Sequence, residues 1–396
     1  MTDRPLKILY HHRTQGRGAE GVHIASIVRE LEKAGHQVKV LSPAGVDPLS
    51  KAGAAPVDKA NVKTQGVGSL WKFISKKLPN FLFEIAEIFY NIVAARALER
   101  ELAREKYDLI YERYAFYLIA GAIKANKYKI PLILEANEVS GIKERARKQS
   151  FKWLCDRFEG FLFKRCFHVH TVSSYLKSMI CARGVPDDRV LVTPNAIDPE
   201  KFSGKHNNDQ LRQSLGLKDR QVIGFAGWFD HWDRLDLLLD VFNKLHKKHD
   251  NLSLLLIGDG AVLGPLRNSI KQMQLEDRVV LTGAVPRTEI QNYLSLLDIA
   301  VFTHSNEFGS PVVMFEFMGL KIPVIAPKLM PITDVLQHEQ SALLFDVLNM
   351  QQLESLLDRA PREKSLRHQL AEHAYTLLMS NYTWQHNANK IVEAVR

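Results

Sequence analysis

The sequence has few cysteines and no long apolar run. Its 396 residues include only Cys155, Cys166 and Cys181, an odd number without the spacing of a zinc site. We interpret them as reduced thiols of a cytoplasmic protein and assign them no chemistry. No apolar run is long enough to span a membrane. The first ten residues lead directly into an expected strand and not into a signal peptide.

Signatures of nucleic-acid binding are also missing. We find no zinc finger, no RNA-recognition motif and no tract that interleaves arginine with aromatic residues. Lys plus Arg number 53 against 44 for Asp plus Glu, which gives a net charge of +9. This excess favours anionic partners, such as nucleoside diphosphates or anionic lipid headgroups. Nucleic acid is the weakest of the anionic candidates, and we expect none.

Strand and helix patterns alternate along the chain in two successive series. The first opens with a strand at 6–11, a glycine-containing loop, a helix at 22–33 and a strand at 38–41, which is typical of a doubly wound sheet. The pattern restarts with a strand at 222–226. We therefore expect an α/β protein with two Rossmann-like domains, 1–198 and 199–379. Further helices of the first domain are expected at 71–104, 115–126 and 143–165, and a C-terminal helix at 380–396 is expected to pack back on this domain.

The segment EFGSPVVMFEFMG at 307–319 is the most informative part of the chain. Its Gly-Ser-Pro turn leads into an expected apolar helix, and the N-terminus of a helix presents backbone N–H groups that suit a diphosphate. Glu316 falls within the apolar run, where a carboxylate is costly unless it is paired or faces a ligand. A ribose diol would be a suitable partner. We expect the ligand in the cleft between the two domains, at the carboxyl ends of the strands.

Taken together, the motifs resemble those of the retaining GT-B glycosyltransferases of family 4, over nearly the full length. Each motif is weak alone, but their order and spacing match: GRGAEG at 16–21, TPNAID at 193–198, FAGW at 225–228, IGDG at 257–260, LTGAVPR at 281–287 and the segment at 307–319. The resemblance implies transfer of a sugar from a nucleoside-diphospho-sugar to a hydroxyl, with retention of configuration and without a metal or other cofactor. The acceptor would be a glycan, a lipid-linked molecule or a small molecule, bound mostly by the first domain.

The donor would lie mostly on the second domain, with the ribose hydroxyls on Glu316. The donor-binding residues that the resemblance implies are Gly16, Gly18, Gly227, Arg234, Val285, Arg287, Phe308, Gly309, Ser310, Pro311, Val312, Val313 and Glu316. Gly16 and Gly18 also fit a dinucleotide fingerprint, but no acid follows the second strand to bind a ribose. We interpret their loop as backbone that faces phosphate or acceptor, with a plain strand-to-helix turn as the alternative.

Several positions depart from the family pattern. Phe308 stands where many relatives carry the glutamate that holds the donor sugar, so the adjacent Glu307 is our candidate for that contact. Val313 stands where one branch of the relatives carries a lysine before the helix. Trp228 and Asp233 stand where relatives carry the Arg or Ser and the Lys that bind the donor phosphates, so the adjacent Arg234 is our candidate for the missing charge.

The expected strand at 131–135 leads to two further candidates for catalysis. Asn137 replaces a histidine that contacts the donor sugar in many relatives, and it can hydrogen-bond but cannot titrate near neutrality. A cap at the end of the strand is an equal alternative for this side chain. We expect Glu138 to orient the acceptor hydroxyl. Glu307, Asn137 and Glu138 thus form the predicted catalytic set, whereas His11, His12 and Asn195 are interpreted as structural.

Two other functions stay open at this point. An epimerase acting on a nucleotide sugar would share the fold, and a catalytically silent protein that binds a nucleotide sugar would tolerate the lost lysines. The aromatic and lysine-rich segment at 70–83 also has two interpretations. It could dock on the inner face of an anionic membrane, or form a helix that packs on its own domain, which Pro79 favours slightly.

Overall fold

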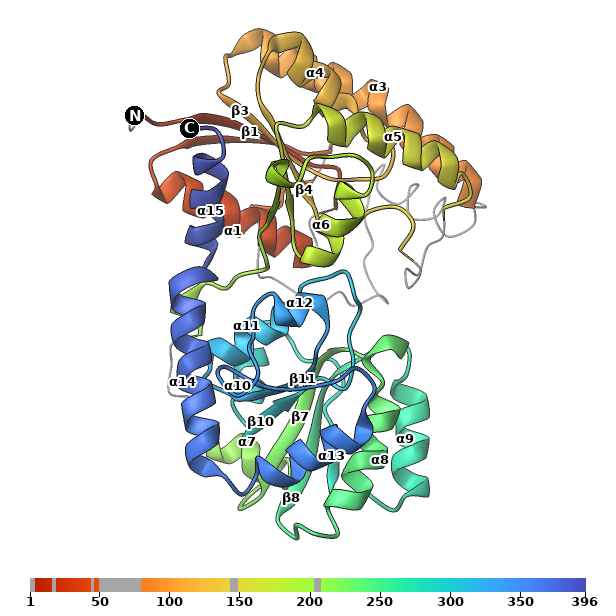
Figure 1. Ribbon diagram of the computed structural model, residues 1–396, viewed down its shortest axis with the longest axis vertical. Helices are drawn as coiled ribbons and strands as arrows, with labels where there is room; N and C mark the ends of the chain where they lie inside the picture. The colour runs from red at the N-terminus through yellow and green to blue at the C-terminus, as the bar shows by residue number, and fades with distance from the viewer. Residues whose placement is uncertain (1–3, 16–18, 44–45, 50–79, 143–148, 203–207) are drawn as a thin grey trace. The chain divides into compact units, whose positions relative to one another are not determined.

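A computed structural model describes residues 4–15, 19–43, 46–49, 80–142, 149–202 and 208–396 of the chain (Figure 1). The described residues form two compact units. The N-terminal unit holds those up to Thr193 together with those from Trp384 onward, and the C-terminal unit holds Pro194–Thr383. The chain enters and leaves the C-terminal unit side by side, because Ile197 and Thr383 form a parallel bridge.

The N-terminal unit is built on a parallel six-stranded sheet in the order β2-β1-β3-β4-β5-β6. Its strands are β1 (Lys7–His11), β2 (Gln37–Leu41), β3 (Leu109–Arg113), β4 (Leu132–Ala136), β5 (His168–Thr171) and β6 (Val190–Val192). Its helices are α1 (Ala19–Lys33), α3 (Asn80–Arg104), α4 (Ala120–Tyr128), α5 (Lys152–Arg165), α6 (Ser174–Cys181), the 3₁₀ turn η1 (Asp187–Arg189) and α15 (Trp384–Glu393). Helices α3, α4 and α5 lie side by side, and α15 packs on α1 (Figure 1).

The C-terminal unit also has a parallel six-stranded sheet, in the order β12-β11-β10-β7-β8-β9. Its strands are β7 (Gln221–Trp228), β8 (Leu252–Asp259), β9 (Val279–Leu281), β10 (Ile299–Val301), β11 (Val324–Pro327) and β12 (Leu343–Phe345). Its helices are α7 (Asp209–Ser214), α8 (Leu235–Leu245), α9 (Leu263–Gln272), α10 (Ile290–Leu294), α11 (Val312–Gly319), α12 (Met330–Thr333), α13 (Met350–Arg359) and α14 (Lys364–Asn381), with 3₁₀ turns η2 (Pro199–Lys201) and η3 (His231–Asp233). The predicted α/β architecture with two doubly wound sheets is therefore confirmed.

Continuous apolar runs explain why these strands could be recognised from the sequence. A parallel strand covered by helices on both faces is buried throughout and does not alternate apolar with polar residues. Strand β8 shows this, since Leu252 to Ile257 are all buried. Helix α8 instead buries one side, and its acidic residues Asp236 and Asp240 lie off the buried set.

Two expected helices begin later than predicted. Helix α4 begins at Ala120 and not at residue 115, because Tyr117 adopts a left-handed backbone with φ 61°. The Asn91 side chain on α3 then accepts hydrogen bonds from the N–H groups of Ile119 and Ala120 (2.8 and 3.0 Å). Helix α5 begins at Lys152; residues 149–151 are not helical, and 143–148 lie outside the described residues. The first part of the helix expected at 71–104, residues 71–79, also lies outside them.

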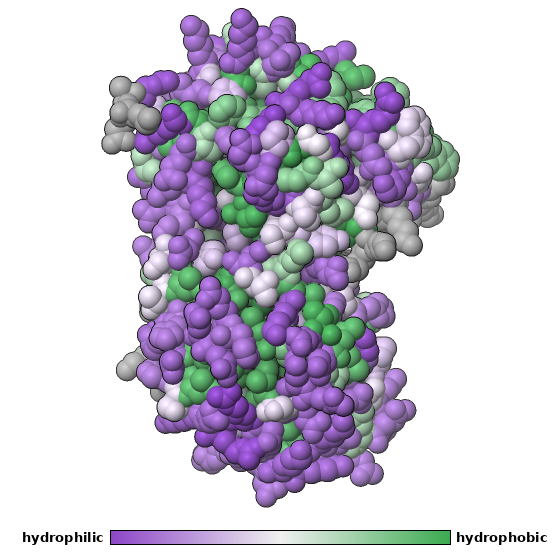
Figure 2. Space-filling model, viewed as in Figure 1, coloured by the Kyte–Doolittle hydropathy of each residue, from purple (hydrophilic) through white to green (hydrophobic). Residues whose placement is uncertain are grey.

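Among the described residues, no helix is both long and apolar enough to cross a membrane. Most of the surface visible in Figure 2 is hydrophilic, so apolar side chains that reach it are conspicuous.

The ends of β7 and β8 approach so closely that a side chain cannot fit between them. Gly258 has φ +138°, and a Cβ there would lie 1.9 Å from the carbonyl oxygen of Gly227. Both features require glycine. This contact fixes the start of two loops at the carboxyl edge of the sheet.

We predict that Gly258→Ala lowers the free energy of unfolding by about 2 kcal/mol or more, because backbone strain and overlap add. Chemical denaturation measures the change. Gly264→Ala is the matched control, since it lies in α9 with nothing within 4 Å of a Cβ, and it should be neutral or slightly stabilising. Equal stability of the two variants would contradict the close approach.

Candidate functional site

The C-terminal sheet has its switch point between β7 and β10. The chain runs outward from β7 to β8 and β9, then returns to β10 on the other side of β7. Loops that leave the carboxyl ends of two such strands border the crevice where ligands of doubly wound sheets bind. Here these loops comprise residues 229–234 and 302–311. His304 Nδ1 lies 3.0 Å from the carbonyl oxygen of Trp232 and joins the two loops.

The loop at 302–311 is held by two asparagines. Asn306 Oδ1 accepts a hydrogen bond from the Gly309 N–H at 2.5 Å. The Asn195 backbone N–H donates to Ser310 Oγ (3.1 Å), and its Nδ2 donates to the Ser310 carbonyl oxygen (2.6 Å). Asn195 was predicted to be a structural turn residue. The structure adds that it fixes the turn directly before α11.

Pro311 precedes α11, and no side chain caps this end of the helix. A helix without a side-chain cap leaves N–H groups of its first turn available to other acceptors. Val312 and Val313 begin the helix, so their backbone, and not their side chains, is the part that could contact an anion. Phe308 and Gly309 lie in the loop before it and are both partly buried.

Glu316 lies in the middle of α11 with only 1% of its surface exposed. Its flanking residues Phe315 and Phe317 are fully buried. Arg287, in the loop that follows β9, forms an ion pair and hydrogen bond with Glu316 Oε1. Burial raises the pKa of Glu316 above its ordinary value, and the Arg287 guanidinium partly offsets that rise. The structure therefore brings together two residues that the sequence suggested separately.

The remaining predicted donor residues lie on neighbouring loops of the same edge. Gly227 occupies the end of β7, and Val285 lies in the loop after β9, packed against the core of the unit. Arg234 follows η3 with a left-handed backbone, and its Nε and Nη2 bind Asp236 at 3.0 and 2.9 Å. Its charge is thus shared with an exposed neighbour. Glu307 is in the loop at 302–311 and is half-buried.

Asp233 is buried beside this crevice. Its Oδ2 accepts a hydrogen bond from the Asp230 N–H at 2.9 Å. Burial raises the pKa of Asp233 to about 7, so near neutral pH it is a partly protonated acid at the position of an expected lysine. The structure explains how an acid is accommodated here but supplies no cation at this position.

In the N-terminal unit, Asn137 directly follows β4 and binds Glu135. Asn137 Nδ2 donates to Glu135 Oε1 at 2.7 Å, and Tyr10 Oη donates to Glu135 Oε2 at 2.8 Å. Arg113 also pairs with this buried carboxylate. Burial alone would raise the pKa of Glu135, but Arg113 and the other partners outweigh it and hold the pKa at about 2. Both the capping and the sugar-binding interpretation of Asn137 remain compatible with this geometry.

A small polar cavity lies next to Asn137. Its volume is about 10 Å³, space for about one water molecule. Asn137 Oδ1 and His170 Nε2 line it, and neither atom has a hydrogen-bond partner among the described residues. Burial lowers the pKa of His170 to about 3, so the ring is neutral. A bound water is the simplest partner for both atoms.

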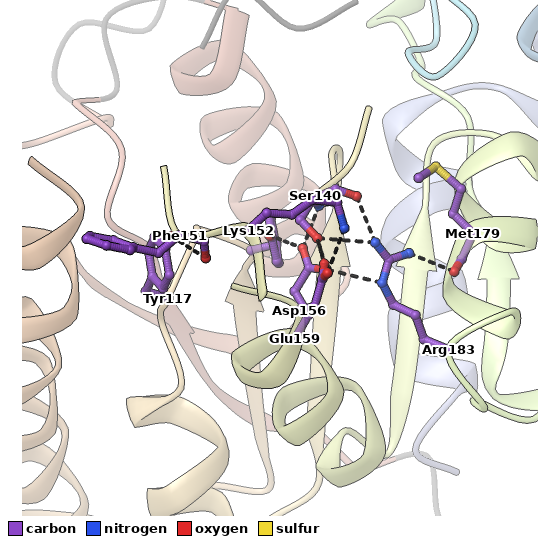
Figure 3. A network of polar contacts seen from close by, with 9 residues as sticks. Tyr117, Ser140, Phe151, Lys152, Asp156, Glu159, Met179 and Arg183 are labelled. Carbon is purple, nitrogen blue, oxygen red and sulfur yellow. Dashed lines mark hydrogen bonds and ion pairs between the residues drawn. The ribbon is translucent and has the colours of Figure 1, made fainter. Parts of the chain in front are cut away.

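The loop after Glu138 is anchored by a network around Glu159 (Figure 3). Ser140 donates to the Glu159 carboxylate through its backbone N–H (2.6 Å) and its hydroxyl (2.7 Å). Arg183 Nε lies 3.2 Å from Glu159 Oε2, and Arg183 Nη2 donates to the Ser140 carbonyl oxygen at 2.7 Å. Asp156 Oδ1 lies 2.6 Å from the same hydroxyl oxygen and shares its single proton with Glu159. The network fixes the segment that carries Glu138, and no sequence motif predicts it. Gly16 and Gly18 lie outside the described residues.

Both units of the chain match sequence profiles of glycosyltransferases. The sequence profile of "Glycosyltransferase Family 4" matches residues 20–201, and that of "Glycosyl transferases group 1" matches residues 207–377. The chain is 25% identical over 233 residues to the lipopolysaccharide 1,2-N-acetylglucosaminetransferase of Salmonella typhimurium, 57% of this chain and 60% of that protein. It is 24% identical over 281 residues to an Escherichia coli UDP-Gal:alpha-D-GlcNAc-diphosphoundecaprenol alpha-1,3-galactosyltransferase, 68% of this chain and 70% of that one. The matched part thus spans less than two thirds of the Salmonella relative.

Solved structures share the fold along nearly the whole chain. A glycosyltransferase from Rickettsia africae superposes with a TM-score of 0.75 at 14% identity, covering 99% of this chain and 98% of that one. Anabaena HepE in complex with UDP-glucose superposes with a TM-score of 0.67 at 18% identity, covering 98% and 99%. At this identity the superpositions establish the GT-B fold, as predicted.

The ion pair of α11 gives a prediction about stability. In Arg287→Met, no guanidinium offsets the burial of Glu316. A carboxyl with a higher pKa in the folded chain binds its proton more tightly there. The stability lost by burying this carboxyl is therefore small below the ordinary pKa of 4.5, and it grows as the pH rises through the folded-state pKa. We expect the free energy of unfolding to fall by about 1–3 kcal/mol at pH 8 and by clearly less at pH 5.

Denaturant titrations at the two pH values measure this difference. The double variant Arg287→Met/Glu316→Gln should recover much of the loss at pH 8, because no buried charge remains. Arg267→Met, at an exposed position of α9, is the control. An equal loss at both pH values would show that Arg287 does not compensate the Glu316 charge.

Proposed function

The chain belongs to the family 4 glycosyltransferases, and we propose that it is a retaining hexosyltransferase that uses a nucleoside-diphospho-sugar. The acceptor is a hydroxyl of a glycan or lipid-linked glycan in surface-glycan or glycoconjugate biosynthesis. One observation carries the proposal. A buried carboxylate, Glu316, lies on the helix that follows the switch-point loop and is paired with a half-exposed arginine, Arg287.

The donor nucleoside would bind beside this pair. A ribose diol can donate two hydrogen bonds, and a carboxylate is acceptor-only when ionised. Glu316 would accept from the diol while Arg287 keeps the carboxylate charged. The Arg287 side chain is 44% exposed, against 2% for that of Glu316, so the arginine can adjust its position when a ligand arrives.

The diphosphate would lie at the start of α11. The turn at Gly309 and Ser310 is fixed by Asn306 and Asn195, so its backbone is already ordered for an anion. Preorganised donors stabilise the charge that develops on a leaving diphosphate more effectively than groups that must rearrange. Arg234 is a second candidate, although it would have to exchange Asp236 for phosphate.

The chemical step would follow the front-face route that the resemblance implies. The bond between the anomeric carbon and the diphosphate breaks, the acceptor oxygen bonds to the same face, and the acceptor proton passes to a leaving-group oxygen. The protein then contributes by orienting the reactants. We assign Glu307 and Asn137 to hydroxyls of the donor sugar and Glu138 to the acceptor hydroxyl.

The acceptor class follows the relatives. One is named for lipopolysaccharide, and another acts on GlcNAc attached to diphosphoundecaprenol. Bacillus subtilis TuaC, named for teichuronic acid biosynthesis, is 23% identical over 94% of this chain and 92% of its own length. A glycan or a lipid-linked glycan is therefore our proposed acceptor.

Donor binding tests the central assignment. A ligand that binds only the folded chain raises its melting temperature, so screening UDP, GDP and ADP by thermal shift identifies the base. For the diphosphate that binds, we predict that Glu316→Gln raises the Kd about tenfold or more, because hydrogen bonds to a charged group are lost. Titration calorimetry measures the Kd. Glu276→Gln, at an exposed position, should bind as the wild type does, and unchanged binding by Glu316→Gln would refute the assignment.

The proposed contact between Glu307 and the donor sugar can be tested separately from binding of the nucleoside diphosphate. We predict that Glu307→Gln lowers kcat/KM about 10- to 100-fold with the nucleotide sugar but leaves the Kd of the free nucleoside diphosphate unchanged, because that ligand has no sugar. Sugar transfer, donor hydrolysis and sugar epimerisation are followed by product analysis. Glu289→Gln, also exposed, is the control. A weaker affinity for the free diphosphate would place Glu307 elsewhere in the site.

A further inference from the structure

Helix α3 (Asn80–Arg104) has apolar side chains on its outward side and buried acids on its inward side. In a helix that borders water, polar residues normally face outward and apolar residues face the core. In the first half of α3 this is reversed. Its acids, Glu84 and Glu87, are buried, whereas Phe81, Ile85 and Phe89 are exposed.

The buried acids have defined partners within the unit. The Glu84 carboxylate accepts hydrogen bonds from Tyr117 Oη (2.5 Å) and from the N–H groups of Ser150 (2.5 Å) and Phe151 (3.0 Å). Glu87 pairs with Arg13 Nη2 at 2.6 Å. These contacts fix the rotation of the helix, so its outward apolar side is a property of the folded unit.

The outward side of α3 has two parts. Its first half exposes six large apolar side chains: Phe81, Leu82, Ile85, Phe89, Ile92 and Val93. Its second half exposes Arg96, Arg100 and Arg104, and no exposed residue of α3 is acidic. The apolar part spans 13 residues, about 18 Å at 1.5 Å per residue. Helices that lie in a membrane interface combine exposed apolar side chains with Arg and Lys, and the outward side of α3 presents both apolar side chains and arginines.

Helix α5 extends this surface. Glu84 holds the start of α5 next to the start of α3 through Ser150 and Phe151, and Trp153 in this first turn is 65% exposed. The exposed residues of α5 are Lys152, Trp153, Arg157, Lys164 and Arg165, again without an acid. Figure 2 shows apolar surface over this end of the two helices. Tryptophan is favoured where an apolar phase meets water.

We propose that this α3–α5 surface docks on an anionic lipid bilayer. The apolar stripe and Trp153 enter the boundary between headgroups and acyl chains, and the arginines and lysines bind anionic headgroups. A second copy of the chain is a poorer occupant, because the exposed residues of α3 and α5 include arginines and lysines but no acid, so an identical surface offers them no opposite charge. The proposal concerns only described residues and is independent of the sugar-transfer chemistry.

Co-sedimentation with vesicles tests the proposal on the full chain. We expect the wild type to bind vesicles of phosphatidylglycerol and phosphatidylcholine, and to bind pure phosphatidylcholine about tenfold more weakly because the headgroup attraction is lost. The triple variant Ile85→Gln/Phe89→Gln/Val93→Gln should lower partitioning on the mixed vesicles by about tenfold or more. The matched control is Met330→Gln/Val347→Gln/Met379→Gln, three exposed apolar residues of the other unit, which should bind as the wild type does.

Two further measurements separate the outcomes. Mixed vesicles should shift the tryptophan emission of the wild type to shorter wavelength, and Trp153→Phe should abolish most of that shift. Donor hydrolysis without vesicles should be equal in the wild type and both triple variants, so a loss of membrane binding is distinct from a failure of the proposed activity. Absence of vesicle binding, equal binding by the α3 variant, or conversion of a dimer to a monomer by that variant would each overturn the proposal.

Discussion

A buried carboxylate on a short apolar helix is the constraint around which the C-terminal unit is arranged. Glu316 lies among fully buried phenylalanines on α11 and cannot remain charged there without a partner. Arg287 supplies that partner from the loop after β9. The pair therefore joins a loop and a helix that leave the same edge of the sheet, next to the switch point between β7 and β10. A site for an anionic, hydroxyl-rich ligand follows from that arrangement.

The N-terminal unit also contains several buried carboxylates that are paired with groups on other elements. Glu135, Glu159 and Glu84 are buried carboxylates, and each accepts hydrogen bonds from backbone or side-chain groups of other elements. Glu135 and Glu159 fix the two ends of the turn that carries Asn137 and Glu138. Glu84 fixes the rotation of α3 and so determines which of its side chains reach the surface. In each case the buried carboxylate is stable only while its hydrogen-bond donors are in place, so it orders the loop or helix that supplies them.

The sequence predicted features that depend on neighbouring residues and missed those that depend on distant ones. The parallel strands are continuous apolar runs, and the turn before α11 has its own glycine, serine and proline, so both could be predicted. The late start of α4 depends on Asn91, which is 28 residues before Ile119. The contact of Asn195 with Ser310 joins residues 115 apart. The pairing of Arg287 with Glu316 was missed for the same reason, although both residues had been named as candidates.

The proposed function depends on the Glu316 carboxylate receiving the ribose of the donor. A crystal structure of the chain with the nucleoside diphosphate that binds it most tightly would show whether it does. We expect ribose hydroxyls within about 3 Å of the Glu316 carboxylate and the diphosphate next to the first turn of α11. A nucleotide bound elsewhere, with Glu316 contacted only by Arg287, would contradict it.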